Sequence, residues 1–394
     1  MNKRLFQTFA AGLILACVII YGCITRYDPP GVKSFTKLLV VEGIITDSIT
    51  TIRLSRSVAL SESLNYALVN DGEVYVECDD GSVSEVSLFA GNGAYKIRTG
   101  KLNPDRQYRI KVNLDGETYR SEFLTPLMTP DFELSWVQRA NRALVSIQVS
   151  TQDTLKQSAY YLWSYLEDWE FTARLWVDSF CVNFEWVPHD ISAPGNRYYC
   201  WKKDSSRIFI LGNAERMIGN EIKDREIMSF FASSERVSLL YHIAVKQHLI
   251  RKEAYAYYAN LQKNIEQAGS IFTPIPAEIP GNLYCVTSPD LPVIGYVEVS
   301  TTVVQKKFIE AKDVYIGTAY DVENIKEDCY YYNKKGFFQP PPECYNTVSI
   351  QWAVINPSVW FLSRIRIDYN PICVDCIKAG GTKDKPEWWP TDHL

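Results

Sequence analysis

The sequence has little of what many enzymes and nucleic-acid-binding proteins need. Only four histidines occur in 394 residues, and they are scattered: His189, His242, His248 and His393. The formal net charge is −5, whereas a nucleic-acid-binding protein needs a basic face. The chain also lacks a Gly-rich phosphate loop and the HExxH and GxSxG motifs. We therefore expect no nucleic-acid partner, no metal site and no cofactor.

Long hydrophobic runs are also missing after residue 23, where no stretch is long and apolar enough to span a bilayer. Before that point, Lys3 and Arg4 precede a short apolar run at residues 9–21, and Gly22-Cys23 follows. A basic start, a short apolar run and a small residue are typical of a secretory leader.

The position of Cys23 predicts a bacterial lipoprotein. A small residue before the cysteine admits the signal peptidase, and the thiol then carries the lipid. We expect a signal peptide at 1–22, lipidation at Cys23 and a polar tether at 23–36. Cys17 is a second candidate for the lipid, but cleavage there would cut the apolar run short.

Ten cysteines occur, and eight remain when Cys17 and Cys23 are set aside. An even number in an exported chain predicts disulfides. Seven of the eight lie beyond residue 150, and these are the candidates: Cys181, Cys200, Cys285, Cys329, Cys344, Cys373 and Cys376. Nearness in sequence favours bonds between Cys181 and Cys200 and between Cys329 and Cys344.

Cys373 and Cys376 form a CxxC motif, which in other settings is a redox pair or half of a zinc site. No second CxxC exists and no histidine is nearby, so neither interpretation has support. We expect one of the two to bond a distant cysteine, with Cys285 as the candidate.

Short alternating runs with turn signals between them fill residues 38–121, a pattern typical of β-sandwiches. Asp79-Asp80-Gly81 predicts a hairpin turn. Leu102, Pro104 and Tyr108 resemble the entry to a late strand in fibronectin-like sandwiches, where the tyrosine hydroxyl holds the corner. We predict a mainly β protein that starts with an immunoglobulin-like β-sandwich at 37–127.

Residues 128–394 predict a larger, disulfide-containing, β-rich domain. Apolar residues four and three apart, ending before Gly269, predict one long helix at about 251–268. Residues 180–205 read as a loop holding Cys181 and Cys200. Strands are expected at 143–149, 160–171, 207–211, 237–248 and 295–300.

Aromatic residues make up 13% of the chain, with 10 Trp and 25 Tyr. Tyr330, Tyr331 and Tyr332 lie in the predicted Cys329–Cys344 loop, and we interpret them as surface anchors for a partner. The alternative is that this loop, residues 320–347, packs over the adjacent sheet. His189-Asp190 near Ser192 could hint at a hydrolase, but adjacent loop residues favour a solvated loop, so we do not expect an enzyme.

Several short sequence motifs between residues 269 and 389 occur in a recognisable order. They are Gly269-Ser270-Ile271-Phe272, Gly281-Asn282, Cys373-Val374-Asp375-Cys376, Gly380-Gly381-Thr382 and Lys385-Pro386-Glu387-Trp388-Trp389. This order resembles the domain-of-unknown-function 4249 family of Bacteroidota lipoproteins. The resemblance implies a lipoprotein of the outer membrane, often encoded beside a TonB-dependent transporter, and it supplies no catalytic residues.

The resulting expectation is a lipid-anchored accessory or ligand-capture partner of such a transporter, held at the membrane by its N-terminal lipid. An envelope adhesin or scaffold is the alternative, and a hydrolase is less favoured.

Overall fold

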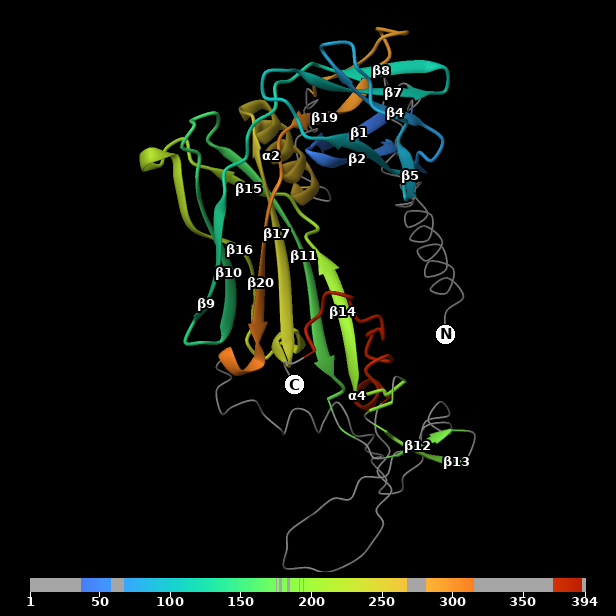
Figure 1. Cartoon of the computed structure of the whole chain (residues 1–394), viewed down its shortest axis with the longest axis vertical. Helices are drawn as coiled ribbons and strands as arrows, with labels where there is room; N and C mark the ends of the chain where they lie inside the picture. The colour runs from blue at the N-terminus through green and yellow to red at the C-terminus, as the bar shows by residue number, and fades with distance from the viewer. Residues whose placement is uncertain are drawn as a thin grey trace, which may run out of the picture.

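The computed structural model describes residues 37–57, 67–174, 176, 179–182, 185–190, 192–193, 195–267, 281–314 and 371–391. The predicted leader 1–22, the tether 23–36 with Cys23, and the 320–347 loop with Cys329, Cys344 and the three tyrosines Tyr330, Tyr331 and Tyr332 lie outside these residues. Figure 1 shows an elongated molecule with a β-sandwich at one end and a longer set of strands below it.

The sandwich consists of two sheets. The first has the order β19-β1-β2-β6-β5, with β3 paired to β2, and the second has the order β18-β8-β7-β4. The strands of the first sheet are β1 (Leu39–Ile45), β2 (Ser48–Arg56), β3 (Ala67–Leu68), β5 (Leu88–Gly91), β6 (Ala94–Gly100) and β19 (Val293–Val299). Those of the second are β4 (Glu73–Cys78), β7 (Tyr108–Leu114), β8 (Glu117–Ser121) and β18 (Leu283–Cys285).

Period-two alternation builds the core of the sandwich. In β2, Ile52 and Leu54 are buried whereas Thr51 and Arg53 are exposed, as expected for a sheet with one face inward. The predicted corner is confirmed, because the Asn103 backbone N–H donates to the Tyr108 hydroxyl at 2.9 Å.

The predicted boundary at residue 127 is wrong for this unit, because two of its strands come from beyond it. β19 pairs in parallel with β1 over its whole length, and β18 pairs with β8. Val297 and Val299 are buried in the same cluster as Val41 and Ile52. The sandwich therefore closes only after the chain has passed through most of the second unit and returned.

The turn at Asp79-Asp80-Gly81 is confirmed, but the hairpin it was expected to join is not regular. The Asp80 carboxylate accepts from the Ser82 N–H at 2.9 Å, and Glu77 and Val83 form a single bridge. The chain then crosses to the other sheet, where β5 pairs with β6.

The second unit packs two sheets face to face, in the orders β16-β10-β9 and β14-β11-β17-β20, with β15 also on β11. Its strands are β9 (Phe132–Arg139), β10 (Leu144–Gln152), β11 (Tyr160–Thr172), β12 (Ser179–Val182), β13 (Glu185–Pro188), β14 (Tyr199–Ser205), β15 (Ile210–Asn213), β16 (Glu221–Phe231), β17 (Leu240–Ile250) and β20 (Val303–Glu310). Its short helical elements are η1 (Ile218–Asn220), η2 (Glu235–Val237), η3 (Ala311–Asp313) and α4 (Pro371–Val374).

Alternation along β11 and β17 decides which side chains enter this core. Tyr161 and Trp163 are fully buried between the sheets, together with Tyr241 and Ile243 of β17, as their period predicted. The side chains of the intervening residues point to the other face of the β14-β11-β17-β20 sheet.

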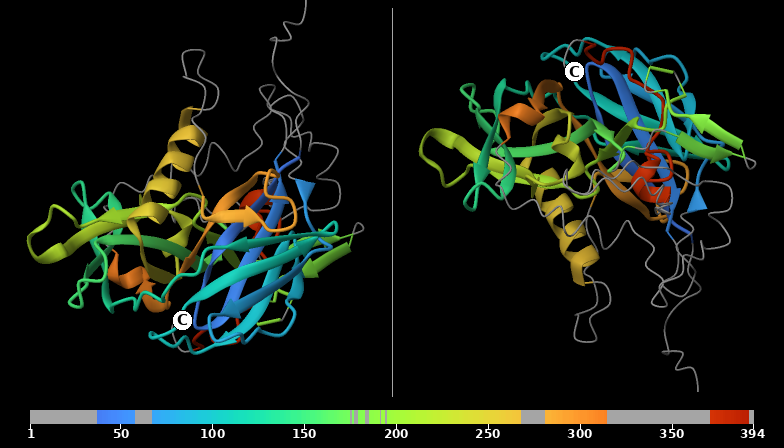
Figure 2. Two further views of the ribbon diagram at one scale, coloured as in Figure 1. Left: turned by 90° about the horizontal axis from the view of Figure 1, so that it is seen from above. Right: turned by 90° about the horizontal axis from the view of Figure 1, so that it is seen from below.

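The long helix is confirmed as α2 (Lys252–Gln267). Its apolar stripe, including Ala254 and Tyr258, covers the end of the β14-β11-β17-β20 sheet nearest the sandwich, where it meets Tyr160 and Leu162. Tyr296 of β19 joins the same cluster, so the helix spans both units. Figure 2 shows α2 projecting from one side of the molecule.

The expectation of a loop at 180–205 is wrong in part. Residues 199–205 form β14, an edge strand paired with Leu166–Thr172 of β11. β12 and β13 form a small separate hairpin. The strand was missed because polar residues such as Lys202, Lys203 and Asp204 hide the apolar alternation of β14. An edge strand beside solvent needs few apolar side chains.

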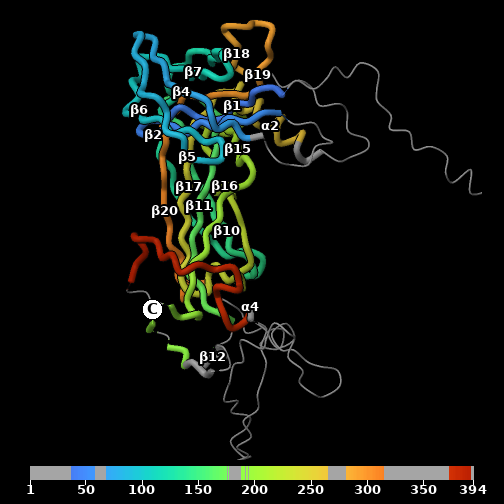
Figure 3. Tube along the Cα trace, turned by 90° about the vertical axis from the view of Figure 1, so that its right-hand side faces the viewer, coloured from blue at the N-terminus to red at the C-terminus, as the bar shows by residue number. Residues whose placement is uncertain are grey.

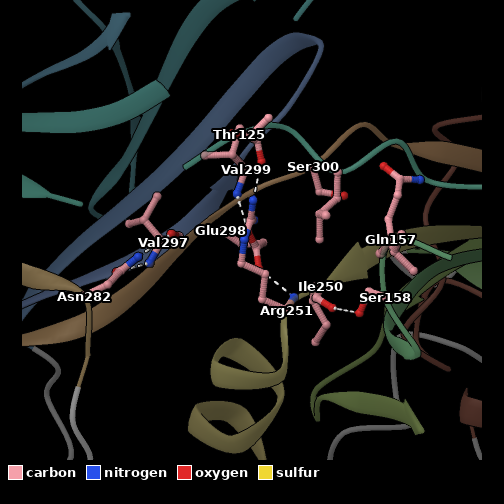
Figure 4. A network of polar contacts seen from close by, with 12 residues as sticks. Thr125, Gln157, Ser158, Ile250, Arg251, Asn282, Val297, Glu298, Val299 and Ser300 are labelled. Carbon is pink, nitrogen blue, oxygen red and sulfur yellow. Dashed lines mark hydrogen bonds and ion pairs between the residues drawn. The ribbon is translucent and has the colours of Figure 1, made fainter. Parts of the chain in front are cut away.

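A polar cluster, which we call the junction, joins the two units (Figure 4). The chain crosses between them at residues 125–130 and again after Val299, and these passages are hydrogen-bonded: Leu127 N–H donates to Val299 O at 3.0 Å. Glu298 is fully buried and accepts from the Arg251 backbone N–H at 2.8 Å. The Arg251 guanidinium pairs with Glu298 and donates to the Thr125 carbonyl. The junction therefore fixes how the two units are oriented.

Among the helices of the described ranges, none has both the length and the apolar character needed to cross a membrane.

Candidate functional site

The β14-β11-β17-β20 sheet has one face that is only partly covered, which we call the open face. Residues opposite one another in antiparallel strands share a face, so the strand register lays out this face in rows across the sheet. The first row considered contains Lys203, Asp168, His242 and Phe308, and the row beyond it, farther from the sandwich, contains Glu170 and Glu310. The second row contains Ser205, Leu166, Ala244 and Lys306, and the third contains Ser164, Lys246 and Val304.

These three rows combine exposed apolar side chains with lysines. Leu166 is 49% exposed, Val304 41% and Phe308 40%. Lys203, Lys246 and Lys306 are exposed as well. Isolated exposed apolar residues are normal, but a group of them on one face is typical of a contact surface.

The C-terminal segment (371–391) covers the end of this sheet that is far from the sandwich (Figure 3). Thr382 forms an antiparallel bridge with Trp201 of β14, with N–H to O distances of 2.8 and 2.9 Å. The Trp389 indole N–H donates to the buried Glu170 carboxylate of β11 at 2.9 Å. The segment and α2 therefore bound the open face at its two ends.

A disulfide between Cys200 and Cys376 fastens this segment to β14. The predicted Cys181–Cys200 bond is therefore wrong, because nearness in sequence does not bring two cysteines together once Cys200 lies in a strand. The predicted partner Cys285 is also wrong, since that residue is a buried free thiol, as is Cys78.

Cys376 does bond a distant cysteine, as expected for one member of the CxxC motif. Cys373 is disulfide-bonded as well, and because Cys376 already pairs with Cys200, the two do not bond each other. The motif is therefore not a dithiol redox pair in this structure. It fixes the start of the C-terminal segment.

Four aromatic side chains, those of His242, Phe308, Trp388 and the buried Trp389, meet where this segment borders the first row. The His242 ring lies 4.3 Å from Trp388 and 4.8 Å from Phe308, centroid to centroid. Trp388 is 50% exposed, whereas His242 beneath it is only 3% exposed. Trp388 and Phe308 therefore present ring surface to solvent at one end of the open face, which suits contact with apolar groups of a partner.

His242 has no hydrogen-bond partner on either ring nitrogen among the described residues. Its Nδ1 lies 3.6 Å from the Asp168 carboxylate. A buried polar group without a hydrogen bond costs free energy. A ligand group that reached the His242 imidazole could therefore form a hydrogen bond with it.

Two other stretches rich in Tyr and Trp, residues 160–169 and 255–258, lie mostly in the core. Tyr161, Trp163 and Trp169 are buried between the sheets, and Tyr257 and Tyr258 lie on the buried face of α2. Phe308 and Trp388, which do face solvent at this end of the open face, were not predicted as contact residues. The only available signal for Phe308 was its place in an alternating run.

His189, Asp190 and Ser192, the residues that could suggest a hydrolase, make contacts within their own loop. His189 Nε2 accepts from the Arg197 backbone N–H at 3.1 Å, and its ring stacks on Trp176. Ser192 N–H donates to the Asp190 carboxylate at 2.8 Å, a turn contact. Asp190 is therefore engaged by the backbone rather than by His189, which gives the solvated-loop interpretation its physical basis.

In the part of the chain that the structure describes, no group of three or more His, Cys, Asp or Glu side chains is placed to hold a metal ion.

His248, on β17 at the junction, gives the fold an expected sensitivity to acid. Burial lowers the pKa of His248 to about 4, with Lys246 adding to the effect and the Thr301 backbone and Asp47 opposing it. An unfolded histidine titrates near 6.5, so below that pH protonation favours the unfolded chain. We expect this group to lower the free energy of unfolding by about 2–3 kcal/mol between about pH 7 and about pH 4.5.

Urea unfolding of the wild type and of His248→Gln at both pH values tests this expectation. The wild type should lose more stability on acidification than the variant, by about that amount. Equal losses would assign the acid sensitivity to other groups.

One family model matches the chain over residues 24–306, and its description is "Domain of unknown function (DUF4249)". The matched range includes both sheets of the sandwich and most of the second unit, and it ends within β20 at Lys306. Phe308 and the C-terminal segment lie beyond it. No curated protein matches the chain.

Proposed function

The chain belongs to the DUF4249 family, and from that premise we propose that it is a lipid-tethered, non-enzymatic binding protein of the outer membrane. Its proposed partner is a TonB-dependent transporter, and its proposed contact is the open face with Phe308 and Trp388 at one end. The observation that carries this proposal is the exposed aromatic and aliphatic surface of that face, on a rigid sheet.

The N-terminal sequence supports the tether. Lys3 and Arg4, the short apolar run and Gly22-Cys23 favour lipidation at Cys23. Residues 23–36 would reach roughly 46 Å when extended, at about 3.3 Å per residue. Tethering raises the effective concentration at a membrane partner, so a modest interface can suffice.

The shape of the molecule supports a contact away from the sandwich. The described chain begins at residue 37, just before strand β1 of the sandwich, so a tether ending at residue 36 would join the molecule there. Eight residues of mostly extended chain separate Ser300 at the junction from Phe308, or about 26 Å at about 3.3 Å per residue. The junction holds that distance, since Arg251 and Glu298 lock the two units together.

Co-purification of the native lipoprotein in mild detergent tests the proposal. We expect the wild type to bring down a TonB-dependent barrel, and the pair Phe308→Ser and Trp388→Ser to reduce recovery of the barrel about tenfold or more, because aromatic anchors dominate interface energies. Phe231→Ser is the matched control, since Phe231 is 67% exposed on the other sheet.

Failure of the wild type to recover any barrel would contradict the transporter partnership. An equal loss with Phe231→Ser would contradict the assignment of the contact to the open face. Cys23→Ala should abolish lipid labelling, and labelling that persists at Cys17 would contradict the choice of anchor.

A further inference from the structure

The open face is basic although the chain as a whole is acidic. Lys203, Lys246 and Lys306 come from three different strands, and the register places them within the same three rows. None of them forms an ion pair in the described part of the chain. Other lysines of this unit do: Lys202 pairs with Glu235 at 2.6 Å and Lys312 with Glu310 at 2.5 Å.

Opposing charge on the three rows is limited to Asp168, whose carboxylate is directed to His242 at 3.6 Å. The remaining positions are apolar or hydroxylic: Ser164, Leu166, Ala244, Val304, Phe308 and Ser205. The whole chain has a formal net charge of −5, which would repel an acidic group. Attraction of an acidic group to this face therefore depends on Lys203, Lys246 and Lys306.

The space between α2 and the C-terminal segment restricts what can lie there. Successive rows are two residues apart, so the first and third rows are separated by about 14 Å along the strands. That width admits one extended polypeptide with its side chains, which occupies about 10 Å.

We propose that the open face receives an acidic polypeptide segment of the partner, lying across the strands. Its carboxylates would pair with Lys203, Lys246 and Lys306, and its apolar side chains would pack on Leu166, Val304 and Phe308. Aliphatic side chains among the lysines favour a polypeptide over a polysaccharide, whose sugars stack chiefly on aromatic rings. This inference rests on the proposed function and names the chemistry of its contact.

Site-specific photo-crosslinking in the full-length lipoprotein, in its native membrane, tests the inference. A benzoylphenylalanine replaces Leu166, at the centre of the face, and in the control it replaces Ile218, which is 98% exposed elsewhere on the same unit. We expect the Leu166 probe to crosslink a partner peptide rich in Asp and Glu, and the Ile218 probe not to crosslink that peptide. Any of three results would overturn the inference: a crosslinked peptide that is neutral or basic, crosslinking to lipid alone, or no crosslinking at all.

Charge reversal provides the second measurement. Lys203→Glu, Lys246→Glu and Lys306→Glu together should lower the crosslink yield at least about tenfold, since complementary charges fix such contacts. The control reverses three exposed charges of the same unit, Lys156, Arg216 and Arg225, and should stay within about twofold of the wild type. Should the first triple misfold, judged by its melting temperature, the corresponding Gln variants replace it. Equal losses in the two triples would reduce the effect to net charge and overturn the inference.

The outcomes separate this inference from the proposed function. An acidic peptide from a protein that is not a TonB-dependent barrel would sustain the inference and contradict the transporter partnership. A barrel that co-purifies but crosslinks through a neutral segment would sustain the partnership and contradict the inference. Competition of the crosslink by dextran sulfate but not by a synthetic oligoglutamate peptide would identify a polysaccharide site and overturn it.

Discussion

Arg251→Met is expected to lower the free energy of unfolding by about 3–5 kcal/mol, because it leaves a buried carboxylate without its countercharge. Glu298 is 0% exposed, and it keeps only its bonds from the backbone N–H groups of Arg251 and Val299. Burial already raises the pKa of Glu298, and Arg251 opposes that shift. Removing the guanidinium raises this pKa further. Urea or thermal unfolding measures the loss.

The pH dependence and a double variant identify the cause. Since Glu298 in the folded variant can take up a proton, the deficit of Arg251→Met should shrink as the pH is lowered toward about 5. Adding Glu298→Gln should recover much of the loss, because the charge is then gone. Lys252→Met, which removes the adjacent exposed pair with Glu215, should leave the stability nearly unchanged. A deficit that is independent of pH and not recovered by Glu298→Gln would show that Arg251 acts through packing alone.

Replacing Cys200 and Cys376 together by Ala is expected to cost about 3–5 kcal/mol, because the bond closes a loop of 176 residues and so restricts the unfolded chain. The C-terminal segment should also become locally mobile. It would then rely on the disulfide of Cys373, the ion pair between Asp375 and Arg197, the Thr382–Trp201 bridge and the bond from Trp389 to Glu170. Denaturant unfolding reports the global loss, and limited proteolysis between residues 371 and 391 reports the local one.

The free cysteines provide the control for that experiment. Cys285→Ala removes a buried thiol that closes no loop, and it should cost much less than the double variant. Peptide mapping without reduction should link Cys200 to Cys376 and find Cys78 and Cys285 open to alkylation after denaturation. Equal stability of the double variant and the wild type, or a mapped bond from Cys200 to Cys181, would contradict this assignment. Because the bond holds Trp388 near Phe308, the double variant should also weaken the proposed partner contact.

Local pattern in the sequence determined some of the elements. Alternation in 160–171 and 237–248 identified both central strands and the faces of Tyr161 and Tyr241, because side chains of a strand must alternate whatever lies beside it. The helix α2 followed from its stripe, and the Tyr108 corner from a short motif. Each of these features depends on contacts within about a dozen residues.

Tertiary structure alone decided the pairing of distant segments. Nothing in 293–299 identifies β1 as its neighbour, since a parallel partner is selected by the route of the whole chain. The bond from Cys200 to Cys376 likewise depends on β14 lying beside the returning C-terminus.

The lysines of the open face show most clearly which features depend on local sequence and which depend on tertiary structure. Lys203, Lys246 and Lys306 are separated by dozens of residues, and each alone is an ordinary solvated lysine in a mildly acidic chain. Strand register brings them into three adjacent rows. Sequence determined this only for Lys246, which alternates with the buried Tyr241, Ile243 and Val245 in the predicted strand at 237–248. The strands that carry Lys203 and Lys306 were not predicted. Only the order of strands in the sheet determined that the three lysines would face the same solvent together, because that order is set by packing of residues far apart in the chain.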